Sequence, residues 1–256
     1  MAFYDLNKDE RQKLVDQINF AILSDIEKGK SANILKYFSD EDTYIRKTAY
    51  LAIGKIYFTN NHRMTLSHPM IILKLLDEFI KSPSEKVMQT TINSAGEIGM
   101  YDFAPIEHLM ERGLFDAHHS VRNAVIGSIK KMGEKNPKPV LKFAKRFLHH
   151  EDKEIRREIC HGIELRGRKH PQDILPLLKE LQHDKTSRVR NTLVHVLGQI
   201  AYKKGCLETV VADLKTWNNK DLVTDALEEI IYVHERYKDF AVKTQREAIA
   251  YIEKNF

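Results

Sequence analysis

Residues 183–200, HDKTSRVRNTLVHVLGQI, contain the pattern that decides the fold. A polar turn precedes the pair Val189-Arg190, and apolar residues then return with the 3.6-residue period of an α-helix. The same pattern occurs in residues 149–166, HHEDKEIRREICHGIELR, and again in residues 115–132, FDAHHSVRNAVIGSIKKM. The three copies are equally spaced along the chain, and recurrence at a fixed spacing predicts a chain built from repeated structural units.

Further copies extend the repeat toward both ends of the chain. Ile45 begins an earlier copy, Val87 begins a degenerate one, and Val223 stands one regular step after Val189. The step from Ile45 to Val87 is longer than the others, so we expect a longer loop near residues 59–67. Each copy follows a turn of acidic or polar residues, which cap helix N-termini by accepting hydrogen bonds from free backbone N–H groups. Each copy therefore predicts the start of a helix.

A second amphipathic stretch lies before each turn, and several of these stretches open with proline, which fits the first turn of a helix. They cover residues 69–80, 105–114, 139–148 and 171–181. Neither helix of a pair can bury its apolar stripe alone, so the pairs must stack, and no strand-like alternation occurs. We predict an all-α fold, a right-handed α-solenoid of about six helix pairs. The pairs occupy residues 31–236, with caps at residues 9–30 and 237–256, in a single domain of residues 1–256.

The polar turn, the Val/Ile-Arg pair and the small residues of the second helix resemble the HEAT-repeat (armadillo-like) family. In that family the aspartate of the turn and the arginine often pair between neighbouring repeats. The resemblance therefore implies a structural role for these arginines rather than ligand binding. The candidate pairs are Asp116/Arg122, Asp152/Arg156 and Asp184/Arg190.

Positive charge is concentrated in the middle of the chain. Lysine and arginine outnumber aspartate and glutamate by 21 to 11 in residues 118–215, whereas the segments before and after carry net charges of −3 and −2. Eight of the twelve histidines lie in the same block. A basic band of this kind favours a polyanionic partner, and the alternative is a set of solvated lysines on the backs of helices.

The sequence also bears on the compartment. The first residues lack the basic-then-apolar layout of a signal peptide. No apolar run is long enough to cross a bilayer, so we expect no membrane association. Two cysteines, Cys160 and Cys206, cannot build a disulfide framework. These features predict a cytoplasmic protein.

Equivalent positions of successive second helices are expected to form rows on one surface. Counting from each β-branched residue, the positions two, six and nine residues later lie off the buried stripe, and His161 and His195 occupy the same column. In a solenoid the second helices line the concave surface, so these positions and the loops that follow form the predicted binding face. The candidate binding residues are Asn123, Lys130, Arg157, His161, Glu164, Arg166, Arg168, Lys169, Asn191, His195, Lys203 and Lys204.

The residue types in this set favour an anionic partner. Arginine and lysine neutralise phosphates, while asparagine and histidine donate hydrogen bonds to phosphates or bases. We therefore expect a groove for nucleic acid, DNA or RNA, and the alternative is a well-solvated rim. The expected phosphate contacts are Arg157, Arg166, Arg168, Lys169, Lys203 and Lys204.

Part of the chain resembles a narrower group, the HEAT-like DNA alkylation-repair glycosylases. The similar segments are residues 150–157, 173–178 and 184–191. The resemblance implies a face that binds duplex DNA, with acidic residues and tryptophans at the damaged base, and Arg157 matches one arginine of the group's double-arginine motif. The chain departs from the group where His161 replaces a glutamate and residues 167–169 replace a proline-tryptophan segment. The single tryptophan, Trp217, lies elsewhere.

Few other residues indicate chemistry. His161 and His195 could share a metal ion only if a carboxylate joined them, so we expect no metal and no cofactor. Cys160 occupies a packing position, and Cys206 lies near a helix start, where a thiolate could be stabilised. No phosphate-binding loop or nucleophile elbow occurs. We expect a non-catalytic HEAT-repeat protein that binds a macromolecule; the alternatives are a protein-interaction scaffold and, if the protein is an enzyme, a DNA glycosylase.

Overall fold

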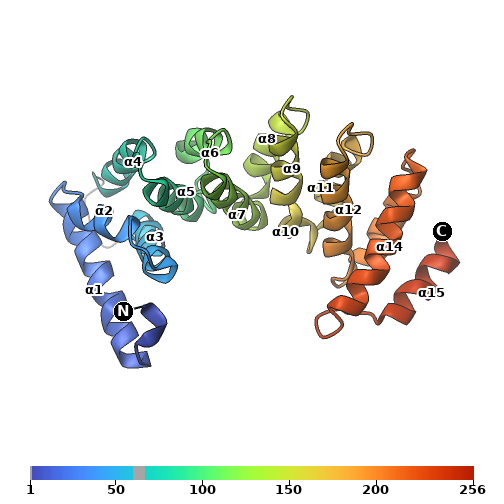
Figure 1. Cartoon of the computed structure of the whole chain (residues 1–256), viewed down its shortest axis with the longest axis horizontal. Helices are drawn as coiled ribbons and strands as arrows, with labels where there is room; N and C mark the ends of the chain where they lie inside the picture. The colour runs from blue at the N-terminus through green and yellow to red at the C-terminus, as the bar shows by residue number, and fades with distance from the viewer. Residues whose placement is uncertain (1, 60–66) are drawn as a thin grey trace. The chain divides into compact units, whose positions relative to one another are not determined.

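The computed structural model describes residues 2–59 and 67–256 (Figure 1). Every regular element in these residues is an α-helix or a short 3₁₀-helix, and no strand occurs among them, so the all-α prediction is confirmed. The longer loop expected near residues 59–67 falls almost entirely outside the described residues. No helix in the described part of the chain combines the length and the apolar character needed to span a membrane.

The helices group into two compact units, Met1–Asn136 and Pro137–Phe256. In the first unit a long helix precedes three helix pairs, and successive second helices pack on one another. The elements are η1 (Phe3–Asp5), α1 (Lys8–Glu27), α2 (Ala32–Phe38), α3 (Thr43–Phe58), α4 (Ser67–Phe79), α5 (Glu85–Gly99), η2 (Ala104–Ile106), α6 (Glu107–Leu114) and α7 (His119–Lys135).

The second unit contains three further pairs and a last helix. Its elements are α8 (Pro137–Phe147), α9 (Lys153–Gly162), α10 (Glu164–Gly167), α11 (Pro171–Glu180), α12 (Ser187–Ala201), α13 (Cys206–Leu214), α14 (Lys220–Arg236) and α15 (Gln245–Asn255). The second helices of these pairs, α9, α12 and α14, lie side by side (Figure 1). Helix α11 packs against α13.

The second helix of each pair begins at a nearly constant spacing. Helices α5, α7, α9 and α12 start at Glu85, His119, Lys153 and Ser187, which are equally spaced. Helix α14 starts at Lys220, a single position short of the same step. The repeat seen in the sequence is therefore a repeat of helix pairs.

Polar residues of the turns fix where several second helices begin. The side chains of Asp42, Ser84, Asp152 and Asn219 accept hydrogen bonds from backbone N–H groups in the first turns of α3, α5, α9 and α14. Replacing such a cap by alanine typically costs about 1 kcal/mol. The polar turns therefore stabilise these helix starts and set the register in which their side chains project.

The apolar stripes expected from the sequence form the core. On α12, Val189, Leu193, Val196, Leu197 and Ile200 are completely buried. Burying an aliphatic side chain of this size contributes about 1.5–3 kcal/mol. Because this stripe faces the core, the residues between its members lie on the opposite face of the helix.

Neighbouring second helices approach closely where a small residue allows it. A Cβ atom added to Gly198 on α12 would stand 2.6 Å from Cγ of Glu229 on α14. In the first unit, a Cβ atom on Gly54 of α3 would stand 2.6 Å from Cβ of Glu97 on α5. Glycine at this position of the repeat therefore brings side chains of adjacent pairs within reach of each other.

One second helix is interrupted, which the sequence did not predict. Helix α9 ends at Gly162 and α10 begins at Glu164, with Ile163 buried between them. The interruption places Glu164 in the first turn of α10 with 1% of its surface exposed. A carboxylate is thereby held inside the second unit, next to the face formed by α9 and α12.

Candidate functional site

A surface pocket of about 420 Å³ lies between α9 and α12 in the second unit. Two consecutive repeats build it jointly. Its lining residues are Arg157, His161, Ser187, Arg188, Asn191, Thr192 and His195. The lining contains two arginines and two histidines and no carboxylate, so an anion entering the pocket would meet hydrogen-bond donors.

The α9 wall presents Arg157 and His161, which share a helix face because they are four residues apart. Arg157 Nε donates to Glu154 Oε2 at 2.9 Å, and Nη2 lies 3.5 Å from Glu158 Oε1. Only 14% of the Arg157 side chain is exposed. These carboxylates hold the guanidinium in place at the pocket wall.

The α12 wall presents Arg188, Asn191 and His195, at the spacing i, i+3 and i+7 that aligns side chains along one helix face. The Arg188 side chain is 61% exposed, and its Nε lies 3.3 Å from Glu154 Oε1. Glu154 therefore contacts the arginines of both walls. Arg188 was not predicted from the sequence, although its spacing from the two predicted residues on the same helix could have identified it.

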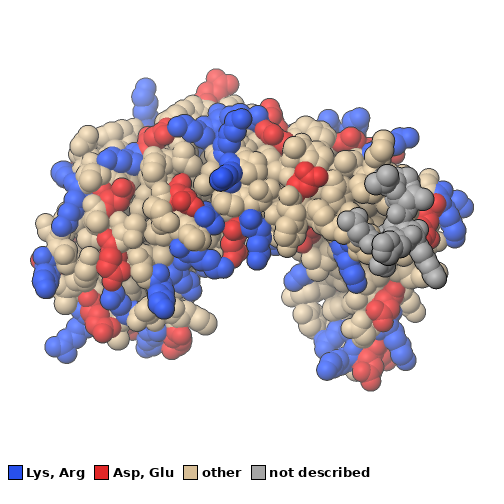
Figure 2. Space-filling view, turned by 180° about the vertical axis from the view of Figure 1, so that it is seen from behind, with Lys and Arg blue, Asp and Glu red and all other residues tan. Residues whose placement is uncertain are grey.

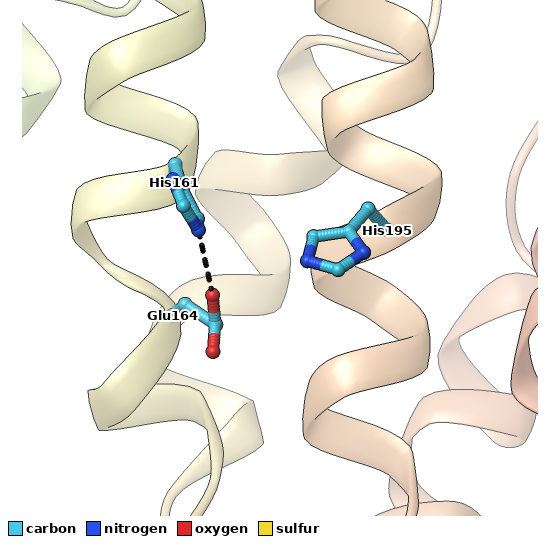
Figure 3. Close-up of side chains that lie close together, drawn as sticks. All are labelled: His161, Glu164 and His195. Carbon is cyan, nitrogen blue, oxygen red and sulfur yellow. Dashed lines mark ion pairs between the residues drawn. The ribbon is translucent and has the colours of Figure 1, made fainter. Parts of the chain in front are cut away.

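Three ionisable side chains meet beside this pocket (Figure 3). His161 Nε2 lies 3.2 Å from Glu164 Oε2, and the rings of His161 and His195 have centroids 6.0 Å apart. One nitrogen or oxygen atom from each of the three residues lies within 4.8 Å of the other two. The two histidines were predicted to lie in one column, and the interruption of α9 adds the carboxylate that a shared metal ion would require.

The arginine of the repeated Val/Ile-Arg pair has the same structural role in four repeats. Through Nη1, Arg46, Arg122, Arg156 and Arg190 each donate to the backbone carbonyl six residues earlier, at 2.5, 2.7, 2.7 and 2.6 Å. Each of these carbonyls belongs to the turn that precedes the second helix. The arginine thus ties the turn to its own helix.

Arg156 also joins two repeats. Its Nε donates to Asp184 Oδ2 at 2.6 Å and its Nη2 to Asp184 Oδ1 at 3.0 Å, so the carboxylate partner comes from the following turn and not from Asp152. Burial opposes ionisation of Asp184, but hydrogen bonds from Arg156 and Thr186 outweigh it and lower the pKa of this carboxyl. Arg156 therefore has the expected structural role, but its partner is Asp184 and not the expected Asp152.

Neither a protein-family model nor a curated protein sequence matches the chain. Among solved structures, the E. coli protein YibA is 18% identical over 98% of this chain and 94% of its own, with a TM-score of 0.44. A designed armadillo repeat protein is 16% identical over 78% of this chain and 98% of its own, with a TM-score of 0.34.

The same turn, helix start and arginine contact recur in successive stacked pairs, and that recurrence decides the fold. The fold is an armadillo/HEAT-like helical repeat. A second designed armadillo repeat protein, solved with the peptide (KR)4, is 17% identical over 89% of this chain and 96% of its own, with a TM-score of 0.28. These similarities assign neither a partner nor a site to the HEAT-like chain.

The HEAT-like structure pairs two of the predicted phosphate-binding arginines with carboxylates of the same unit. Arg166 Nε donates to Asp173 Oδ2 at 2.7 Å. Arg168 Nη2 donates to Glu164 and, at 3.0 Å, to Gln199 Oε1. These two arginines therefore hold the interrupted helix and its neighbours together, and Glu164 is buried rather than part of an open surface.

The remaining predicted cations of the second unit lie in two adjoining loops. Lys169 and Lys204 are exposed, and Lys203 Nζ lies 4.3 Å from the centre of the Tyr202 ring. The loops are in contact, because Cys206 Sγ lies 3.5 Å from the carbonyl oxygen of Arg168. The structure thus brings Lys169, Lys203 and Lys204 to the C-terminal end of α12.

Two predicted residues, Asn123 and Lys130, belong to α7 in the first unit. Asn123 is exposed, and its Nδ2 lies 3.0 Å from His119 Nδ1. Lys130 is partly exposed. Their membership in the same row as the pocket residues stays a prediction.

Neither cysteine nor the tryptophan offers chemistry at the pocket. Trp217 is completely buried, and its Nε1 donates to Asp213 Oδ2 at 2.7 Å. Both cysteines are buried, and burial raises the pKa of the Cys160 thiol far above its ordinary value and also raises the pKa of Cys206. Position near a helix start therefore does not make Cys206 a thiolate.

Charge on the face drawn in Figure 2 is mixed. Figure 2 shows lysine and arginine side chains interspersed with aspartate and glutamate over the face that it draws. The basic excess of the sequence does not gather there into one large area. Local geometry, as in the pocket between α9 and α12, is consequently a better guide to a binding site than net charge.

Proposed function

We propose that this HEAT-like protein binds nucleic acid, an anionic macromolecule. The binding surface would be the face of α12 in the second unit. The pocket between α9 and α12 carries the proposal, because its lining combines Arg157, Arg188 and Asn191 with two histidines and contains no carboxylate. Such side chains contact phosphates and base edges in protein–nucleic acid complexes. These observations support a binding role.

The spacing of the basic groups fits an extended polyanion. Arg188 stands near the start of α12, and Lys203 follows its end, fifteen residues later. At 1.5 Å per residue this is about 22 Å along the helix axis. Along the axis of a DNA duplex, each strand carries one phosphate per about 3.4 Å, so this length of axis corresponds to about six phosphates of one strand. The pocket and the loop lysines could therefore contact one strand at two points.

The test is the salt dependence of duplex DNA binding, measured by fluorescence anisotropy. Arg157, Arg188 and the three loop lysines provide up to five phosphate contacts, which predicts a slope of log Kobs against log[salt] of down to about −4.5. The variant Arg188→Gln/Lys203→Gln/Lys204→Gln should bind more weakly and reduce the slope by about 3, because each lost contact removes about one unit.

A matched control removes charge elsewhere in the same unit. Lys145 and Lys238 have side chains 66% and 68% exposed and lie on α8 and just after α14. The variant Lys145→Gln/Lys238→Gln should leave the slope nearly unchanged. The proposal fails if the native protein shows no binding at low salt, if binding does not respond to salt, or if both variants weaken it equally.

A protein partner is the second candidate, and the first unit provides the observation that favours it. The side chains of Phe20, Leu51, Phe58 and Tyr101 are exposed, Phe20 by 74% and Tyr101 by 67%. They line two adjoining pockets that share Lys55 and Thr59. Exposed aromatic residues of this kind are the usual anchors of protein interfaces.

The two candidates can be separated by one capture experiment. A protein partner on the first unit would be captured from cell extract by the native protein and by the triple variant at the α12 face, but not by Phe20→Glu/Tyr101→Glu. Capture that depends only on the basic residues of α12 would exclude this candidate. A glycosylase would need a tryptophan, tyrosine or phenylalanine ring and a carboxylate in the pocket, and the described lining contains none of these groups.

A further inference from the structure

We infer that His161, Glu164 and His195 form a binding site for a divalent transition-metal ion, with Zn²⁺ the best fit. The site would be a property of the second unit that does not depend on nucleic acid binding. Two imidazoles and one carboxylate are ligands that Zn²⁺ and its neighbours accept, whereas Mg²⁺ and Ca²⁺ prefer oxygen ligands.

The spacing of the ligand atoms supports this inference. Zinc–nitrogen and zinc–oxygen bonds of about 2.0–2.1 Å in a tetrahedron place ligand atoms about 3.3 Å apart. The 3.2 Å between His161 Nε2 and Glu164 Oε2 already matches that edge. All three ligand atoms lie within 4.8 Å of one another, so an ion requires His195 to approach by about 1.5 Å. The His195 side chain is 42% exposed and has room for this rotation.

The residues around the cluster orient the ligands. Nδ1 of His195 lies 3.5 Å from Glu229 Oε1, and Figure 3 shows its other ring nitrogen, Nε2, directed toward His161 and Glu164. A carboxylate that receives the second N–H of a ligand histidine fixes its tautomer and is common at metal sites. The other oxygen of Glu164, Oε1, accepts a hydrogen bond from Arg168, and Oε2 is the oxygen that lies beside His161.

The two ordinary alternatives explain the cluster less completely. An exposed ion pair between His161 and Glu164 would not require Glu164 to be 1% exposed or His195 to turn Nε2 toward it. A row of solvated histidines would not require Glu229 at Nδ1. Three protein ligands leave a fourth position open toward the pocket, where water or an anionic group would complete the coordination.

The test is titration of the tag-free, chelator-treated full-length protein with Zn²⁺ in competition with a chromogenic chelator. The native chain should bind one equivalent, and His161→Asn and His195→Asn should each lose it. Glu229→Gln should weaken binding about 10–100-fold, as loss of an outer-shell partner typically does. Circular dichroism of the metal-free variants checks that each one is folded.

A matched histidine serves as the control. His149 Nε2 lies 2.8 Å from Glu180 Oε2, an exposed His–Glu contact of similar geometry on another surface of the same unit. His149→Asn should bind Zn²⁺ as the native protein does, and bound Co²⁺ should give the strong visible absorption of four-coordinate cobalt. The inference is overturned if the native chain takes up no stoichiometric Zn²⁺, or if uptake persists in the folded His161→Asn and His195→Asn variants.

Discussion

Neutralising either member of the pair Arg156–Asp184 should weaken the contact between two repeats of the second unit. The two hydrogen bonds between these side chains are 2.6 and 3.0 Å long, and the side chains are 13% and 5% exposed. Removing one partner of a buried pair costs about 3–5 kcal/mol, because the other charge is left uncompensated. Arg156 keeps its carbonyl partners in Asp184→Asn, and Asp184 keeps the backbone N–H of Thr186 in Arg156→Met. We therefore expect the lower end, about 3 kcal/mol, for each variant.

Trp217 provides the assay. It is the single tryptophan and is fully buried in the second unit, so its fluorescence in urea follows the unfolding of that unit. With an m-value of about 2 kcal/mol per molar urea, a loss of about 3 kcal/mol lowers the midpoint by about 1.5 M. The exposed contact between Lys238 and Glu235 is the control, and Lys238→Gln should change stability by less than about 0.5 kcal/mol.

The double variant Arg156→Met/Asp184→Asn separates the pair energy from the two single effects. A direct contact predicts that the double variant is more stable than the sum of the single losses implies, by about 1–3 kcal/mol. Additive losses, or single losses below about 1 kcal/mol, would mean that the contact behaves as an ordinary surface ion pair. That result would refute the reasoning that this pair links the repeats.

Three further predictions concern other parts of the chain. Cys160 and Cys206 are buried with raised pKa values, so neither should react with a thiol reagent at pH 8 until urea unfolds the protein; rapid reaction of either in the folded state would contradict their burial. Burial lowers the pKa of His234, so on acidification the unfolded chain takes up the proton first. The contribution of His234 to the free energy of unfolding should therefore be constant above about pH 6.5 and fall as the pH drops below that value. Stability curves that fall equally for the native protein and for His234→Gln would contradict this prediction. Gly198→Ala should lower the free energy of unfolding by about 1–3 kcal/mol, because the new Cβ would lie 2.6 Å from a glutamate of α14. In Gly127→Ala the new Cβ meets nothing within 4 Å, so this substitution should stabilise α7 by up to about 1 kcal/mol. Unfolding midpoints that move in the same direction in the two variants would be inconsistent with this difference in packing.

The helix pairs could be predicted from the sequence because their determinants are local. A polar cap, a β-branched residue and a 3.6-residue apolar period all act within about twenty residues, and the spacing from Val121 to Ile155 and Val189 repeats them in register. The same register placed His161 and His195 in one column. The burial of the stripes followed directly from these patterns.

Contacts between repeats were harder to predict, because they depend on how closely adjacent helices approach. Arg156 reaches Asp184 rather than Asp152, and Arg168 reaches Glu164 and Gln199. No proline in the sequence marks the point at which α9 is interrupted. A single sequence fixes the face of a helix on which a residue lies, but not which neighbour its long side chain reaches.

Part of the site could have been found by extending the columns by one repeat. Glu229 stands six residues after Val223, the position that His161 and His195 hold in the two preceding pairs. Its contact with His195 Nδ1 is therefore a continuation of the same row. Arg188 similarly stands three residues before Asn191, on the same face of α12. Both residues could have been identified from helical spacing alone.

The most direct measurement of the proposed binding face is the NMR titration of the histidine rings with a short DNA duplex, in low salt and with a chelator present. His161 and His195 line the pocket, whereas His234 is buried in α14 and His108 lies on α6 of the first unit. The proposal predicts that the ring signals of His161 and His195 shift with the binding curve and return when salt is added, while those of His234 and His108 stay in place. Saturable binding that leaves both pocket histidines unchanged would contradict it.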